Sequence, residues 1–246
     1  MKILISRISF LFFSDQKFFK YLRKHKLRFI ETNLNTKVTK KNIVQPLAIQ
    51  SIFFNKKIKY DKFFIKQNID HFSFISKFAK KNNIKNINLG NFLSRNLNLN
   101  KDILYKLNTR ILSEFAKIAK KNSQIISLEP VAKKYGSNFL VNTSQVVNFI
   151  NNLNKNNVRL LFDVGNIIYS KQNISFLLKK YIKRINHVHI SSSNIKYINY
   201  TSVRKILNLL IYNQYKKTVS VEFLSNNYEK TNRRIKFLIN NYKDYL

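Results

Sequence analysis

The chain of 246 residues has no cysteine, no tryptophan, one methionine, three glycines and two prolines. Without cysteine, disulfides, thiolate zinc sites, iron–sulfur clusters and cysteine nucleophiles are excluded. With three glycines, the glycine-rich loops that hold nucleotide phosphates are nearly excluded, and no G-x-x-x-x-G-K motif occurs. Four histidines are too few for a cluster of several zinc ions held mainly by imidazole, so any metal site must also use carboxylates.

Acidic residues are also scarce, with 11 Asp and Glu against 46 Lys and Arg and a formal charge of +35. The positive electrostatic potential of such a chain attracts anions, whether sugar phosphates or nucleic acid. A codon bias toward Lys, Asn, Ile, Phe and Tyr would also raise the charge, so its functional meaning stays open. Hydrophobic residues make up 44% and are interleaved with the lysines, which predicts a folded core rather than a disordered basic tail.

Long hydrophobic segments are missing as well, since no apolar run reaches the roughly 18 residues that cross a bilayer. The first 13 residues are largely apolar, but Arg7 interrupts them and no small-residue cleavage site follows. We therefore expect a buried strand there rather than a signal peptide. The lack of cysteine and of a leader predicts a cytoplasmic protein without a membrane segment, and homo-oligomerisation stays open.

Short apolar runs alternate with longer segments of helical spacing. Because the runs are continuously apolar, we expect a sheet buried on both faces, and the alternation with helices predicts parallel pairing. The sequence therefore predicts an α/β fold, a (β/α)₈ TIM barrel with residues 1–246 as a single domain; a doubly wound open sheet is the second choice. The expected strands are Lys2–Ser6, Leu27–Thr32, Pro46–Ile52, Ile84–Gly90, Gln124–Pro130, Val158–Asp163, Ile185–Ile190 and Thr218–Phe223. The expected helices are Asp15–His25, Asp61–Lys81, Lys101–Asn122, Thr143–Asn154, Ile174–Lys183, Ser202–Tyr212 and Tyr228–Tyr242, with Thr36–Asn42 left unassigned.

Four chemically active residues stand at the carboxyl ends of consecutive expected strands. These are Glu129, Asp163, His189 and Glu222. In a barrel these ends meet at the face where active sites form, so we expect the four side chains to converge. Ionised carboxylates at the ends of apolar strands are costly unless a cation neutralises them. The pattern predicts one divalent ion, and oxygen-rich ligation with a single nitrogen favours Mn²⁺ or Mg²⁺, with Co²⁺ or Zn²⁺ as alternatives.

The segments around these residues carry a family resemblance. They are Ser127–Pro130, Tyr135–Phe139, Phe162–Gly165, His187–Ser191 and Val221–Phe223, and upstream Phe29–Glu31, Gln50–Phe54 and Leu89–Asn91 with Arg95. In order and spacing the chain resembles, over nearly its whole length, the xylose isomerase-like TIM-barrel superfamily of sugar (phosphate) isomerases and epimerases.

The resemblance implies a function and roles for the four residues. It implies that Glu129, Asp163, His189 and Glu222 hold the divalent ion and that the two glutamates also act as acid and base. One glutamate would remove a proton from the carbon beside a carbonyl of a small sugar or sugar phosphate, giving an ene-diolate that the ion stabilises. The other would return the proton, which yields isomerisation or epimerisation.

Other residues are candidates for substrate binding. Asn166 stands where many relatives have a substrate-contacting histidine, and Ile195 stands where sugar epimerases often have arginine, with Lys196 beside it. We therefore expect altered substrate contacts, with Asn166 and Lys196 as candidates. His187 shares a strand face with the metal-binding histidine and is either a supporting group or a packed ring. The remaining candidates are Glu31, for which a lysine salt bridge is the alternative, and Arg95.

Three other functions stay open. The related barrel of endonuclease IV and the positive charge favour an abasic-site nuclease that binds DNA, although such a multinuclear zinc centre uses more histidines than this chain offers. A binding protein that has lost catalysis is the second alternative. A dehydratase acting on a cyclic polyol is the third, because it would use the same ion and the same proton abstraction.

Overall fold

The computed structural model describes residues 1–37, 44–53, 56, 58–90, 97–197 and 199–246. Its eight strands form a closed parallel barrel in sequence order, which confirms the predicted (β/α)₈ fold. The strands are β1 (Lys2–Ser6), β2 (Phe29–Thr32), β3 (Gln45–Ile49), β4 (Asn86–Leu89), β5 (Ile125–Leu128), β6 (Val158–Asp163), β7 (Ile185–Ile190) and β8 (Thr218–Val221). The α-helices are α1 (Asp15–Lys24), α2 (Phe64–Lys81), α3 (Lys101–Lys121), α4 (Thr143–Leu153), α5 (Val164–Tyr169), α6 (Ile174–Tyr181), α7 (Tyr200–Tyr212) and α8 (Tyr228–Tyr242).

The observed elements agree with the expected ones, with small differences at their ends and one helix that we did not expect. All eight expected strands are present, several of them shorter, and all seven expected helices are present. The additional helix, α5, begins directly after β6, and its cap residue, Asp163, was assigned from the sequence only as the last residue of that strand. The unassigned segment Thr36–Asn42 lies largely outside the described residues.

Asparagine, which is abundant in this chain, begins most of the helices. The side chain of the N-cap residue accepts a hydrogen bond from a backbone N–H of the first turn, which satisfies one of the donors that a helix start leaves unpaired. Such caps are Ser14, Asn100, Asn142, Asp163, Asn173, Asn199 and Asn227.

The chain divides into two compact units, Met1–Leu47 with Phe162–Leu246, and Ala48–Leu161. In the first unit β1 pairs in parallel with β2 and with β8, and β7 pairs with β8. In the second unit β4 lies between β3 and β5, and β5 also pairs with the start of β6. The expectation of a single domain stays a prediction.

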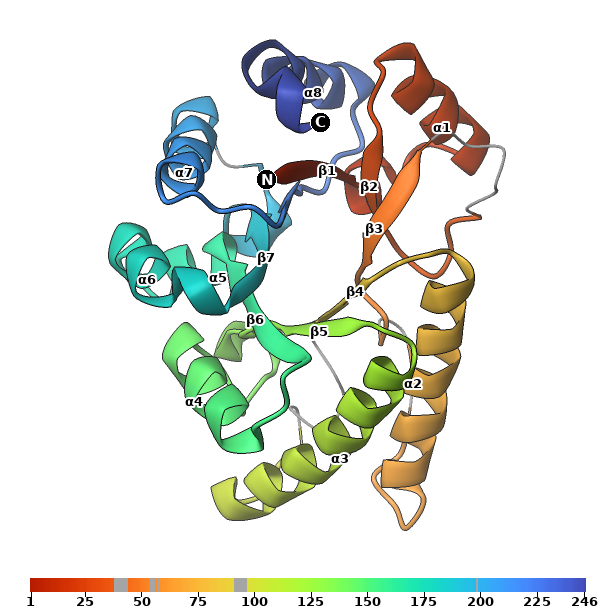
Figure 1. The fold of residues 1–246 in the computed structure, drawn as a ribbon, viewed down its shortest axis with the longest axis vertical. Helices are drawn as coiled ribbons and strands as arrows, with labels where there is room; N and C mark the ends of the chain where they lie inside the picture. The colour runs from red at the N-terminus through yellow and green to blue at the C-terminus, as the bar shows by residue number, and fades with distance from the viewer. Residues whose placement is uncertain (38–43, 54–55, 57, 91–96, 198) are drawn as a thin grey trace. The chain divides into compact units, whose positions relative to one another are not determined.

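Each unit has its own apolar packing. In the first unit Ile3, Leu4 and Ile5 of β1 are at most 1% exposed, and Phe10 packs on Phe18 of α1 with ring centroids 5.2 Å apart. In the second unit α2 and α3 lie side by side (Figure 1), because the parallel rings of Phe72 and Phe115 stack at 4.2 Å. Within the described part of the chain, none of the helices combines the length and the hydrophobicity needed to cross a membrane.

Candidate functional site

Five acidic and histidine side chains of the first unit are buried near the carboxyl ends of its strands. Glu31 lies on β2, Asp163 ends β6, His187 and His189 lie on β7, and Glu222 follows β8 directly. Their exposed fractions are 0% for Glu31 and His187, 2% for His189, 4% for Glu222 and 7% for Asp163. These three carboxylates are the buried ones among the 11 acidic residues, so the chain places its few negative charges where burial is most costly.

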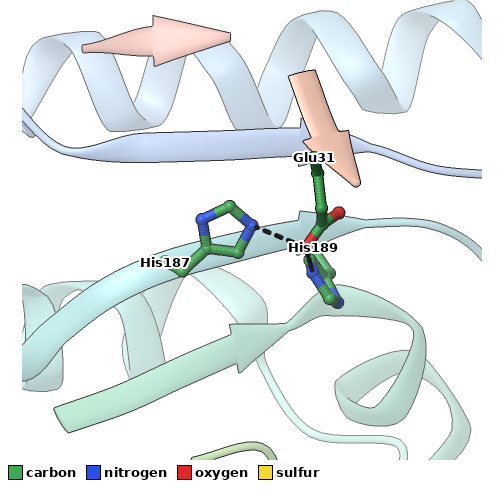
Figure 2. Close-up of side chains that lie close together, drawn as sticks. All are labelled: Glu31, His187 and His189. Atoms are coloured by element: carbon green, nitrogen blue, oxygen red, sulfur yellow. Dashed lines mark hydrogen bonds and ion pairs between the residues drawn. The ribbon is translucent and has the colours of Figure 1, made fainter. Parts of the chain in front are cut away.

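His189 lies at the centre of this group. It contacts Glu31 (Figure 2), with its Nε2 2.9 Å from Oε1 of that residue, and its Nδ1 is 3.3 Å from Oε1 of Glu222. A carboxylate oxygen of Asp163 lies within 4.8 Å of a ring nitrogen of His189. The imidazole therefore lies between two glutamates, with an aspartate near it.

His187 supports the same group from two residues away on β7. Its ring is perpendicular to that of His189, with centroids 4.9 Å apart, so the predicted shared face is confirmed. Its Nε2 lies 3.5 Å from Oε1 of Glu31 and 3.1 Å from the hydroxyl of Ser220, and its Nδ1 lies 2.7 Å from the hydroxyl of Thr218. Both ring nitrogens of His187 are thus in contact with protein groups.

The environment fixes the charge of two members of the group. Burial alone would raise the pKa of Glu31, but the interactions with His189, His187 and Ser220 outweigh it and lower this pKa to about 2. Burial lowers the pKa of His187 to about 3, although the negative charge of Glu31 opposes the change. At neutral pH Glu31 is therefore ionised and His187 is neutral, so His187 contributes no positive charge to balance the carboxylates.

Asp163 serves the local fold as well as the site. Its Oδ1 accepts a hydrogen bond from the backbone N–H of Asn166 and so caps α5. Asn166, a predicted substrate contact, is buried in the first turn of that helix. Lys196, another predicted contact, lies in the connection after β7, where its carbonyl accepts a hydrogen bond from Ser192 N–H at 2.9 Å. The side chain of Lys196 is exposed.

Glu129 belongs to the second unit, where it follows β5. Its backbone N–H donates to the carbonyl of Leu89 at 3.1 Å, and its side chain is half-buried. A Cβ atom added to Gly90 would lie 2.5 Å from Oε2 of Glu129, which is closer than such atoms approach. Glycine at position 90 therefore leaves the space that the Glu129 carboxylate occupies. Arg95, the other candidate from this part of the sequence, lies outside the described residues.

The donor atoms of the first unit fit a hard divalent cation. Carboxylate oxygens with one imidazole nitrogen are typical ligands of Mn²⁺, Mg²⁺ and Zn²⁺. Three buried carboxylates beside two imidazoles, one of them neutral, also leave negative charge that an ion would compensate. Glu31, His187 and His189 also bring one ligand atom each within 4.8 Å of one another, so the ring of His189 faces ligand atoms on both of its sides.

The contact between Glu31 and His189 was not anticipated from the sequence. We expected Glu31 to meet substrate hydroxyls or a lysine, whereas it contacts two histidines. One sequence feature could have indicated this contact. His187 and His189 share one face of their strand, so a buried carboxylate on another strand can reach two imidazoles. Thr218 and Ser220, which hold His187, carried no distinctive sequence signal.

Comparison with known proteins supplies a family. A family model described as "Xylose isomerase-like TIM barrel" matches residues 59–237. Two curated relatives, inosose dehydratases from Clostridium botulinum strains Eklund 17B / Type B and Alaska E43 / Type E3, are each 42% identical to this chain over 48 residues. That match covers 20% of this chain and 16% of the length of each relative.

Solved structures share the fold over almost the whole chain. AP endonuclease, family 2, from Brucella melitensis has a TM-score of 0.81 at 12% identity, with 98% of both chains covered. The IOLI protein with a bound zinc atom has a TM-score of 0.76 at 20% identity, covering 100% of this chain and 99% of that chain. D-psicose 3-epimerase with D-tagatose, from Clostridium cellulolyticum H10, has a TM-score of 0.78 at 16% identity, with the same coverage. At such identities the likeness establishes the fold alone.

Proposed function

Because this chain belongs to the xylose isomerase-like TIM barrel family, we propose that it is a divalent-metal-dependent isomerase or epimerase of a small sugar or sugar phosphate. One observation carries the proposal: Asp163 and Glu222 are buried beside the ring of His189, in a group with more carboxylates than cations. A structural role alone would not require negative charges to be buried together in a chain with a formal charge of +35.

The proposed ligands are Asp163, His189 and Glu222, with Glu129 as the fourth. Glu129 enters the proposal through its position after β5 and through the family resemblance of its sequence segment. When bound, the ion would polarise a substrate carbonyl and its neighbouring hydroxyl, which lowers the cost of the negative charge that develops during proton abstraction. Mn²⁺ and Mg²⁺ fit the oxygen-rich set best, and the zinc atom of the IOLI structure keeps Zn²⁺ among the candidates with Co²⁺.

Glu222 and Glu129 are the proposed acid and base. One carboxylate would take the proton from the carbon beside the carbonyl, giving an ene-diolate, and the other would return a proton to that carbon or to its neighbour. Glu222 is 4% exposed, so little water surrounds it and competes for the proton. Asn166 and Lys196 are the proposed substrate contacts on this side, and Arg95 is a proposed anion contact.

The substrate class rests on the likenesses. D-psicose 3-epimerase is named for a sugar, which supports a small sugar or sugar phosphate as substrate and a place in carbohydrate metabolism. The 48-residue match to inosose dehydratases supports dehydration as the alternative reaction. Both reactions begin with removal of a proton beside a carbonyl, so the same residues would serve either. The absence of cysteine is consistent with the cytoplasmic location that we propose.

The experiment that tests this function measures proton exchange. The protein is incubated with Mn²⁺ and a panel of ketoses, inososes and sugar phosphates in D₂O, and deuterium incorporation is followed by NMR. We expect incorporation at the carbon beside the carbonyl of at least one compound, lost when EDTA removes the ion. No incorporation from any member of the panel with Mn²⁺, Mg²⁺, Co²⁺ or Zn²⁺ would contradict the proposal.

A duplex with one abasic site, incubated with the zinc-loaded protein, tests the nuclease alternative in the same series. We expect no cleavage, because His71 lies on α2 with its Nε2 2.7 Å from the carbonyl of Ile52, and His25 follows α1 at a helix end. Two histidines then remain for the site, fewer than a multinuclear zinc centre needs. Cleavage that EDTA abolishes would favour the nuclease.

A further inference from the structure

We propose that Glu31 is a positioning residue that acts through His189. By accepting a hydrogen bond from Nε2–H, it would hold the imidazole in one tautomer and one orientation, so that the lone pair of Nδ1 is on the side of the ring where Glu222 lies. This inference rests on the proposed function, because the lone pair is needed there only if Glu222, Asp163 and His189 bind an ion. It replaces the substrate-binding role that the sequence suggested for Glu31.

The two sides of the His189 ring differ in geometry. A neutral imidazole carries one N–H, and its hydrogen-bond partners decide which nitrogen has the proton. The distance from Nε2 to Glu31 Oε1 is 2.9 Å, which suits a charge-assisted hydrogen bond, whereas Nδ1 lies 3.3 Å from Glu222 Oε1. The proton therefore belongs on Nε2, and Nδ1 is the nitrogen that can bind an ion.

The burial of Glu31 separates it from substrate. Its side chain is 0% exposed, so it presents no surface to a sugar in solution. A carboxylate buried this completely is destabilising unless it is hydrogen-bonded and paired, and here two imidazoles lie beside it. The position thus suits a group that acts on a neighbouring side chain.

A chain of contacts in turn fixes Glu31. Nε2 of His187 lies 3.5 Å from the same Oε1 atom, and the hydroxyls of Thr218 and Ser220 contact the two ring nitrogens of His187. All of these groups come from β2, β7 and β8, which belong to one unit of the barrel. The arrangement of carboxylate, histidine and metal is a recurrent one, in which the carboxylate raises the basicity of the histidine and sets its angle.

The first test is the tautomer of His189 in the metal-free protein. With four histidines in the chain, a sample labelled with ¹⁵N at the imidazole nitrogens gives four ring systems in a two-bond ¹H–¹⁵N correlation spectrum. At a pH where the ring of His189 is neutral, we expect it in the Nε2–H form in the wild type. In Glu31→Gln, which keeps the size of the side chain and removes its charge, we expect a mixture of both neutral forms. An unchanged His189 pattern in the variant would overturn the proposal.

The second test is the Kd for Mn²⁺, measured by isothermal titration calorimetry on the full chain. Loss of such a partner weakens metal binding by roughly 10- to 100-fold, so we expect an increase of that size in Glu31→Gln and a smaller one in Glu31→Asp, which keeps the charge. Glu114→Gln removes an exposed carboxylate that pairs with Lys117 and should leave the Kd unchanged. An unchanged Kd in Glu31→Gln, with normal circular dichroism, would contradict the role of Glu31 in metal binding.

The two tests separate failure of this inference from failure of the proposed function. If the wild type binds Mn²⁺ and Glu31→Gln binds it equally well, the function stands and the inference falls. If the wild type binds no divalent ion, the proposed function falls, and the metal-free spectrum alone decides whether Glu31 sets the tautomer of His189.

Discussion

Glu222 and His189 face each other across the ladder between β8 and β7, with Oε1 of Glu222 3.3 Å from Nδ1 of His189. The strand register explains this contact. His189 is opposite Ser220, and the backbone N–H of Glu222 donates to the carbonyl of Ile190 at 3.1 Å, which extends the ladder by one residue beyond β8. Side chains two residues apart on a strand share a face, so Glu222 lies on the same face as Ser220 and leans toward the histidine. The backbone of Glu222 is thus fixed by a hydrogen bond to β7 immediately after the end of β8.

Replacement of Glu222 by Gln should abolish proton exchange without unfolding the protein. The amide has the size of the carboxylate but cannot accept a proton, and loss of a general base typically costs 10²- to 10⁴-fold in rate. We expect the same for Glu129→Gln, measured as deuterium incorporation per minute at saturating Mn²⁺. Glu229→Gln, an exposed carboxylate in the first turn of α8, is the matched control. Normal exchange in both site variants would show that the acid and base are elsewhere.

Asp163 should reveal two separable roles when it is changed to Asn and to Ala. Asn retains the cap of α5, whereas Ala removes it at a cost of about 1 kcal/mol in the free energy of unfolding. Neither variant should gain the stability that Mn²⁺ gives the wild type, about 2.7 kcal/mol at a hundredfold excess over the Kd. Chemical denaturation with and without Mn²⁺ measures both effects. A stabilisation of Asp163→Asn by Mn²⁺ that equals that of the wild type would remove Asp163 from the ligand set.

Gly90→Ala should lower activity more than stability. The added methyl group would lie 2.5 Å from Oε2 of Glu129, and because that atom ends a flexible side chain, the carboxylate would move rather than the backbone. A displacement of about 1 Å at a reacting group costs roughly 100-fold in rate. The control is the free energy of unfolding of the same variant, measured by chemical denaturation, which we expect to fall by no more than about 1 kcal/mol. Normal exchange in Gly90→Ala, or a loss of stability large enough to explain the lower rate, would contradict this interpretation.

Lys26→Gly should stabilise the protein. Lys26 follows α1 with a φ of 54°, and the hydrogen bonds from Lys26 N–H to Arg23 and from Leu27 N–H to Leu22 are those of a helix end that usually contains glycine. Glycine adopts the left-handed conformation without the steric cost that a side chain brings, so the substitution should raise the free energy of unfolding by about 1 kcal/mol. Lys24→Gly removes the same side chain from within the helix and should lower it by a similar amount. Equal changes in the two variants would contradict this interpretation.

The sequence was sufficient to predict the strands and the ends that carry the site. Apolar runs such as Leu160–Phe162 are fully buried in the barrel, and a polar residue that closes such a run marks the point where the strand reaches the barrel edge. The positions of Asp163 and His189 at the ends of β6 and β7 follow from this pattern alone. One ligand atom of Asp163 and one of His189 also lie within 4.8 Å of each other.

The contacts within the site could not be predicted in the same way. Glu31 of β2 is opposite Ser6 of the neighbouring strand β1, yet its carboxylate contacts His189 of β7. Two strands, β1 and β8, lie between β2 and β7 in the order of the barrel. Which side chains meet across a barrel depends on the stagger of its strands, and a single sequence does not encode that stagger as a local pattern. The short helix α5 escaped detection for a different reason, because Asp163 is both the end of β6 and the cap of the helix.

The most direct test of the account is a crystal soaked in MnCl₂ and measured at a wavelength where manganese scatters anomalously. We expect one anomalous peak per chain, roughly 2.1 Å from Nδ1 of His189 and from carboxylate oxygens of Asp163 and Glu222. Glu129 should provide a further oxygen ligand, and Nε2 of His189 should remain bonded to Glu31. A peak bound to Nε2 beside Glu31 and His187, or no peak near His189 at all, would contradict the account.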